Sequence, residues 1–194
     1  MPTGVHIHNV RGQLLDAAER VLLRDGPEAL TSRAVAEEAG CAKGVLHRHF
    51  ADFDAFLAEL VLGRVRGIED RTATLCAAAG TGNVADNLAD ALRDLFEPVT
   101  VALIALVTFR DGLRGRLREA GQAGIPPAVQ GTAMIAAYLV AERESGRLAD
   151  DVDVDTLAPT LVGAGHLLFA DRTGGPPQAG AVRRMVATVL AGAV

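Results

Sequence analysis

The side chains best able to do chemistry are scattered along this chain. It contains five histidines and two cysteines, Cys41 and Cys76, and no set of residues that would assemble a nucleophile, a base and an acid. His6 and His8 could each bind a metal, but no third ligand lies near them, so a mobile N-terminal tail is the favoured interpretation. The sequence therefore predicts a protein that is not an enzyme and that uses no metal or cofactor.

A second group of polar residues, within Leu30–Phe50, is spaced for binding instead of catalysis. Four of its apolar residues are spaced to bury one side of a pair of short helices: Val35, Ala39, Leu46 and Phe50. The opposite side then presents Lys43, Gly44, His47 and Arg48 to solvent. Lysine and arginine are poor core residues, so we expect this side to enter the major groove of DNA.

Short local signals define the helices that position this polar face. Thr31 can cap a helix near residues 32–39, and Gly40 can adopt the positive φ that a tight turn needs. Ala36 is small enough for the two helices to approach closely. A third helix follows near residues 42–49, and Asp52 can cap a fourth that begins at Phe53.

The rest of the chain is also predicted to be helical, because Ala and Leu dominate its apolar residues. Helical spacing, glycine stops and prolines indicate further helices near residues 10–25, 53–79, 86–96, 99–109, 128–144, 156–171 and 181–193. The helix near residues 86–96 is expected to start at Asn83 or Asp86. Residues 150–155 are taken as a solvated acidic connector that ends in a helix cap. The prediction is an all-α chain of about nine helices without strands.

Composition and charge limit the possible partners. The net charge of −5 argues against indiscriminate coating of nucleic acid, although a local DNA-binding face remains compatible with it. Residues 31–50 carry a net charge of only +1 (Arg33, Lys43 and Arg48 against Glu37 and Glu38), which predicts modest non-specific affinity and a shallow salt dependence. The start of the chain shows no secretory signal, and no apolar stretch reaches the ~20 residues that cross a bilayer. We therefore expect a cytoplasmic protein with no membrane partner.

Residues 14–62 resemble the N-terminal DNA-binding domain of TetR-family transcription regulators. The resemblance rests on the helix at Thr31–Ala36, the Ala39–Gly40 turn, and the run Lys43–Gly44–x–Leu46–x–Arg48–His49–Phe50. It implies a helix-turn-helix domain over residues 1–52 and a ligand-binding and dimerisation domain over residues 53–194. It also implies a homodimer on a palindromic operator, and it favours a repressor released by a small hydrophobic effector.

Carried over residue by residue, the resemblance assigns Thr31 and Arg33 to phosphate contacts and the third-helix residues to the DNA face. Four positions depart from the family's usual residues: Ala42, Val45, His47 and Phe53. Ala42 cannot cap the third helix, and Val45 offers only apolar contact, for example to a thymine methyl. These departures leave open an alternative, a small-molecule-binding protein of the same fold with weakened or lost DNA binding; an enzyme is a more distant alternative.

The second domain contains candidates for an effector cavity and for a dimer interface. The ligand-binding candidates are Phe96, Leu103, Val107, Arg110, Met134, Tyr138, His166 and Phe169. Tyr138 and His166 each place a polar tip among apolar residues, although a structural hydrogen bond is the more common role for such a group. Apolar stripes on the two C-terminal helices, including Val182, Val186 and Leu190, favour a four-helix dimer interface; packing within one chain is the alternative.

Overall fold

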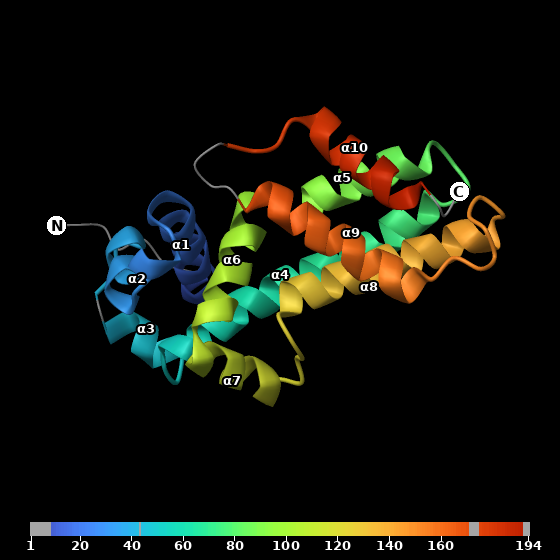
Figure 1. Cartoon of the computed structure of the whole chain (residues 1–194). Coiled ribbons are helices and arrows are strands. Elements are labelled where there is room, and N and C mark those ends of the chain that lie inside the picture. The colour runs from blue at the N-terminus through green and yellow to red at the C-terminus, as the bar shows by residue number, and fades with distance from the viewer. Residues whose placement is uncertain (1–8, 43, 171–174, 192–194) are drawn as a thin grey trace.

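The computed structural model describes residues 9–42, 44–170 and 175–191, so His6, His8 and Lys43 lie outside the described residues. The described part of the chain forms ten α-helices and one 3-10 helix and contains no strand (Figure 1). In chain order they are α1 (Val10–Asp25), η1 (Pro27–Ala29), α2 (Ser32–Glu38), α3 (Gly44–His49), α4 (Phe53–Ala77), α5 (Val84–Leu95), α6 (Pro98–Phe109), α7 (Asp111–Glu119), α8 (Pro126–Glu144), α9 (Val154–Phe169) and α10 (Ala179–Leu190). The prediction of an all-α fold is confirmed.

The helix ends near the polar face lie where the local signals predict them. The Thr31 side chain accepts a hydrogen bond from the Ala34 amide at 3.1 Å and so caps α2. Gly40 has a φ of +64°, a conformation that residues with a Cβ rarely adopt. Asp52 accepts from the Ala55 amide at 2.7 Å and caps α4. These contacts fix the angles at which α2, α3 and α4 follow one another.

The long helix α4 connects two apolar clusters (Figure 1). Its first half packs with α1, α2, α3, α6 and α7 in one cluster, which includes Leu14, Val35, Leu46 and Leu103. Its second half, from Ile68, contributes to the other cluster, with α5, α8, α9 and α10. Helices α1–α3 therefore share a continuous core with α6 and α7, so displacement of α6 or α7 also bears on the packing of α1–α3.

The C-terminal helices also begin at recognisable signals. Asn83 accepts hydrogen bonds from two amides of the first turn of α5, and Asp153, at the end of the acidic connector, caps α9. Pro98 and Pro126 occupy the first positions of α6 and α8, where a missing N–H costs nothing. No helix among the described residues is both long enough and apolar enough to cross a membrane.

Three features differ from the sequence-based expectations. An additional helix, α7, follows α6 after a break at Arg110, which accounts for ten α-helices where about nine were expected. Residues 99–109 are apolar nearly all round, a pattern that predicts a buried helix, but Phe109 at its end is 86% exposed. The main members of the α10 stripe, Val182, Val186 and Leu190, are buried within their own chain against α5 and α9, so they are not available to a second copy.

Candidate nucleic-acid interface and ligand-binding region

The polar face predicted to read DNA is exposed in the structure. Of the described DNA-binding candidates, six are exposed: Thr31, Arg33, Ala42, Gly44, His47 and Arg48. Val45 is half-buried and packs against the apolar cluster beneath α3. The exposed residues lie at the start of α2, just before α3 and along one side of α3, an arrangement that suits an approach to a DNA groove.

Apolar contacts on the inner side hold α3 in this position. Leu46 is fully buried, and Phe50 packs edge-on against Phe56 of α4 with ring centroids 4.9 Å apart. The guanidinium of Arg11 lies 4.4 Å from the Phe50 ring centroid and donates to the His49 carbonyl at 2.8 Å. Arg11 thus connects α1 to the end of α3, a role that no local sequence pattern signals.

Ion pairs compensate the carboxylates close to this face. Glu38 accepts hydrogen bonds from Arg20 and Arg24 of α1, each at 2.7 Å, and these bonds lower the pKa of its carboxyl. Arg33 pairs with Glu37 at 2.8 Å, with both side chains largely exposed. An exposed pair of this kind contributes little to stability, so Arg33 can exchange its partner for a phosphate at little cost.

A polar junction connects the start of α4 to α7. Asp52 pairs with Arg116. The hydrogen bond from the Ala55 amide, together with this ion pair, lowers the pKa of the Asp52 carboxyl. Arg110 pairs with Asp54, and its guanidinium lies 5.3 Å from the centroid of the Phe53 ring. Arg110 was a ligand-binding candidate; the structure places it at the end of α6, where its guanidinium pairs with Asp54 at this junction.

A second charged cluster connects three helices at the middle of α4. Glu97, at the start of α6, accepts hydrogen bonds from Arg64 at 3.0 Å and from Arg71 at 2.8 Å. Arg64 is also 3.6 Å from a carboxylate oxygen of Glu19 in α1. This arginine–glutamate cluster ties α1 to α4 and to the α5–α6 turn.

The ligand-binding candidates do not share a single cavity. Leu103 and Val107 are fully buried in the cluster that also contains residues of α1–α3, whereas Phe96, Met134 and Tyr138 belong to the other cluster. Phe96 and Phe169 line one cavity of about 430 Å³, and Met134 lines a groove of about 260 Å³ between α4 and α5. His166 packs beside Phe96 with ring centroids 5.8 Å apart.

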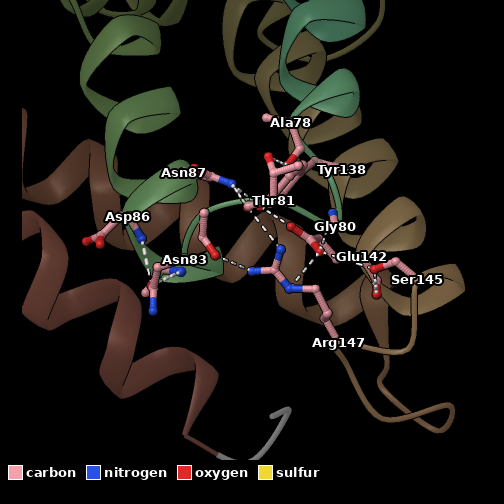
Figure 2. Close-up of polar contacts among 12 residues, drawn as sticks. Ala78, Gly80, Thr81, Asn83, Asp86, Asn87, Tyr138, Glu142, Ser145 and Arg147 are labelled. Carbon is pink, nitrogen blue, oxygen red and sulfur yellow. Dashed lines mark hydrogen bonds and ion pairs between the residues drawn. The ribbon is translucent and has the colours of Figure 1, made fainter.

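The polar tip of Tyr138 is already engaged within the protein (Figure 2). Its hydroxyl donates to Glu142, one helical turn further along α8, and accepts from the Asn87 amide at 2.9 Å. Glu142 is fully buried; it also accepts from the Gly80 amide at 3.1 Å, and its carboxylate lies 3.5 Å from the Arg147 guanidinium. This Tyr138–Glu142 network joins the end of α8 to the loop between α4 and α5.

The sequence analysis did not identify Glu142, although a signal was present. A glutamate four residues after a tyrosine lies on the same face of a helix, so an apolar face carrying both predicts an internal hydrogen bond. Burial and the neighbouring carboxylate raise the pKa of Tyr138, and its hydroxyl keeps its proton at neutral pH. Among the described residues, no group of three or more histidine, cysteine or carboxylate side chains could hold a metal ion.

Comparison with known proteins gives one match by family. Residues 14–60 match the family model for bacterial regulatory proteins of the tetR family. No curated protein matches the chain by sequence.

Solved structures resemble almost the whole chain. A transcriptional regulator of Rhodococcus sp. Rha1 is 20% identical, covers 95% of this chain and 97% of its own, and gives a TM-score of 0.71. The regulator FadR of Bacillus subtilis, solved with stearoyl-CoA, is 15% identical with coverages of 93% and 98% and a TM-score of 0.71. A protein of Saccharomonospora viridis solved with choline is 18% identical with coverages of 94% and 96% and a TM-score of 0.66. At these identities the likeness establishes a common fold.

Proposed function

Because residues 14–60 make this chain a member of the tetR family of bacterial regulatory proteins, we propose that it is a ligand-responsive transcription repressor that binds a palindromic operator as a homodimer. The observation that carries the proposal is the exposed polar edge of α3, held out from a buried apolar frame. In this proposal residues 1–52 bind DNA, and residues 53–194 bind the effector and form the dimer.

Each copy of α3 would lie in a major groove of the operator. His47 and Arg48 are exposed on this helix and reach base edges or phosphates, and the outward part of Val45 offers an apolar contact. Thr31 and Arg33, at the start of α2, bind the adjacent phosphates. With so few cations on this face, the affinity depends on precise contacts more than on overall charge.

The homodimer would form through the exposed sides of α9 and α10. Leu167 of α9 is 77% exposed, and Gly163, one turn earlier, leaves open space beside it. Ala187 is exposed on α10. A two-fold arrangement pairs the same small and apolar surface on both copies, and it spaces the two α3 helices for half-sites roughly 34–36 Å apart.

An effector would release the operator by shifting the helices that pack on the DNA-binding segment. Two proteins of the same fold were solved with small molecules, stearoyl-CoA in one and choline in the other, which favours a ligand-binding role for the C-terminal helices here. A coupling of about 1–3 kcal/mol between the two sites is enough to change operator occupancy 5- to 150-fold.

Selection of bound sequences from a random pool of duplex DNA tests the proposal. A palindrome with half-sites about one helical turn apart is the expected result. The double variant Lys43→Ala, His47→Ala should lose binding to the selected sequence while keeping its dimer mass and melting temperature. Arg118→Ala, which removes an exposed cation from α7, is the matched control and should bind normally. Enrichment of no sequence, or a monomeric chain, would contradict the proposal.

A further inference from the structure

The cavity of about 430 Å³ lies where the DNA-binding segment meets the C-terminal helices. Leu23 of α1 lines one side, the α5–α6 turn lines another, and the end of α9 with residues 175–177 completes it. Its volume is within the range of small-molecule sites in proteins. A ligand in this cavity would contact α1 directly, without an intervening helix.

The wall of this cavity is aromatic. Phe96 and Phe169 stack with ring centroids 5.6 Å apart at an interplanar angle of 28°. The Phe96 ring fits because residue 165 is glycine: a Cβ there would approach the ring to 2.8 Å. Leu23, which is 44% exposed, and Val101 add apolar surface. These groups favour a flat, apolar ligand.

Arg93 and Glu97 are the charged residues among those that line the cavity. Both carboxylate oxygens of Glu97 already accept hydrogen bonds from arginines of α4, so Glu97 has little capacity left for a cation. Arg93 pairs with Asp90, one turn earlier on α5, and that carboxylate is 64% exposed. An exposed pair of this kind is weak, so Arg93 is free to bind an anionic ligand.

Two acidic residues of α5 line a different opening. Asp90 and Asp94 line the groove between α4 and α5, whereas Arg93 and Phe96 line the cavity next to α1. The two sides of α5 thus differ in charge. The side that carries the aromatic wall offers a guanidinium, which binds a carboxylate through two parallel hydrogen bonds.

From this arrangement we infer that the cavity is the effector site and that its ligand is a flat apolar carboxylate. The rings of the ligand stack on Phe169, its carboxylate binds Arg93, and its body contacts Leu23. Because Glu97 lines the same cavity, the ligand also displaces the arginine–glutamate cluster that holds α1 against α4. The effector role rests on the proposed function, but the ligand class does not.

Three probes with one apolar body and different charges test the ligand class: 2-naphthoate, 2-naphthamide and 2-naphthylmethylammonium. Calorimetric titration of the full-length protein without DNA should give tightest binding for the naphthoate. Arg93→Gln should weaken naphthoate binding about tenfold and leave the amide unchanged, since a hydrogen bond to a charged group contributes that much. Arg183→Gln, which removes from α10 another arginine that pairs with an aspartate of α5, is the control.

Four results would overturn the assignment of a carboxylate ligand. They are tightest binding of the ammonium probe, equal binding of all three probes, no binding of any probe, and an Arg93→Gln variant that binds naphthoate with wild-type affinity. The operator affinity is then measured with and without saturating naphthoate. A fall of at least fivefold supports the effector role, and an unchanged affinity refutes it. Failure to bind any selected operator would instead refute the proposed function, and the calorimetric result would still decide the ligand class.

Discussion

Replacing Tyr138 by phenylalanine is expected to lower the free energy of unfolding by about 2 kcal/mol. The side chain is fully buried, and phenylalanine fills nearly the same volume, so little packing is lost. The cost arises at Glu142, whose buried carboxylate loses the hydroxyl that donates to it. Hydrogen bonds to charged groups contribute about 1.5–3 kcal/mol, and a buried acceptor left without its donor loses that contribution.

Denaturant unfolding of four proteins separates this effect from simple loss of volume. The proteins are wild type, Tyr138→Phe, Glu142→Gln and the double variant, all at one protein concentration because dimer stability depends on it. Glutamine keeps an acceptor oxygen but no charge, so the tyrosine substitution should cost about 1 kcal/mol less in that background. Additive effects, or a cost of Tyr138→Phe below about 0.5 kcal/mol, would refute the hydrogen-bond explanation.

The same variant also tests whether stability and DNA binding are separable. The Tyr138–Glu142 network lies at the end of α4 opposite to α3 (Figure 1). Under conditions in which the variant is folded, its affinity for the selected operator should therefore equal that of wild type. A selective loss of operator binding would show that the α4–α5 loop controls the DNA-binding segment.

Three further substitutions have expected outcomes that thermal or chemical denaturation can check. Thr100→Val should leave stability unchanged or raise it by up to about 1 kcal/mol, because the Thr100 hydroxyl is buried with no partner among the described residues; a loss above 1 kcal/mol would reveal a missed hydrogen bond. Gly165→Ala should cost about 1–3 kcal/mol because the added Cβ meets the buried Phe96 ring, whereas Gly67→Ala in α4, where the added Cβ meets nothing within 4 Å, should be neutral or stabilising. Asp52→Asn should retain the helix cap but lose the ion pair to α7. The Ala55 amide and the Arg116 guanidinium both lower the pKa of the Asp52 carboxyl in the folded state. Their stabilisation is therefore present above the unfolded pKa of about 3.9 and is lost as pH falls through the folded pKa. The difference in Tm between wild type and Asp52→Asn should therefore be constant at neutral pH and shrink below about pH 4; a difference unchanged at pH 3 would contradict this.

The helix ends could be predicted because their signals are local. Thr31, Gly40 and Asp52 each act on an amide or a dihedral angle within three residues, so the sequence alone identifies them. Helix α7 was missed because it has only two buried residues, Leu113 and Leu117, within a short charged segment. A single pair of leucines four residues apart is too weak a pattern to distinguish a helix from a loop.

The grouping of the ligand-binding candidates could not be predicted. Helical spacing places Leu103 and Phe96 on apolar faces, but which cluster each one joins depends on how α5 and α6 cross the rest of the chain. Tyr138 was correctly identified as a polar group in an apolar region, and its partner, Glu142, was overlooked. The cavity next to Leu23 is formed by segments distant in sequence, so no local pattern indicates it.

Arg64 lies some distance from the start of α4, and this distance determines how far the start of the helix moves when α4 pivots at Arg64. Arg64 lies eleven residues after Phe53, which at 1.5 Å per residue is a lever arm of roughly 17 Å. A pivot of about 10° at Arg64 would therefore move the start of α4 by about 3 Å. The end of α3, which Arg11 contacts and which directly precedes α4, would move with it. In a two-fold pair the two displacements add to about 6 Å, close to a fifth of the roughly 34 Å repeat of the double helix. In the proposed dimer, a modest tilt of α4 would therefore be sufficient to move the two copies of α3 out of register with the grooves of the operator.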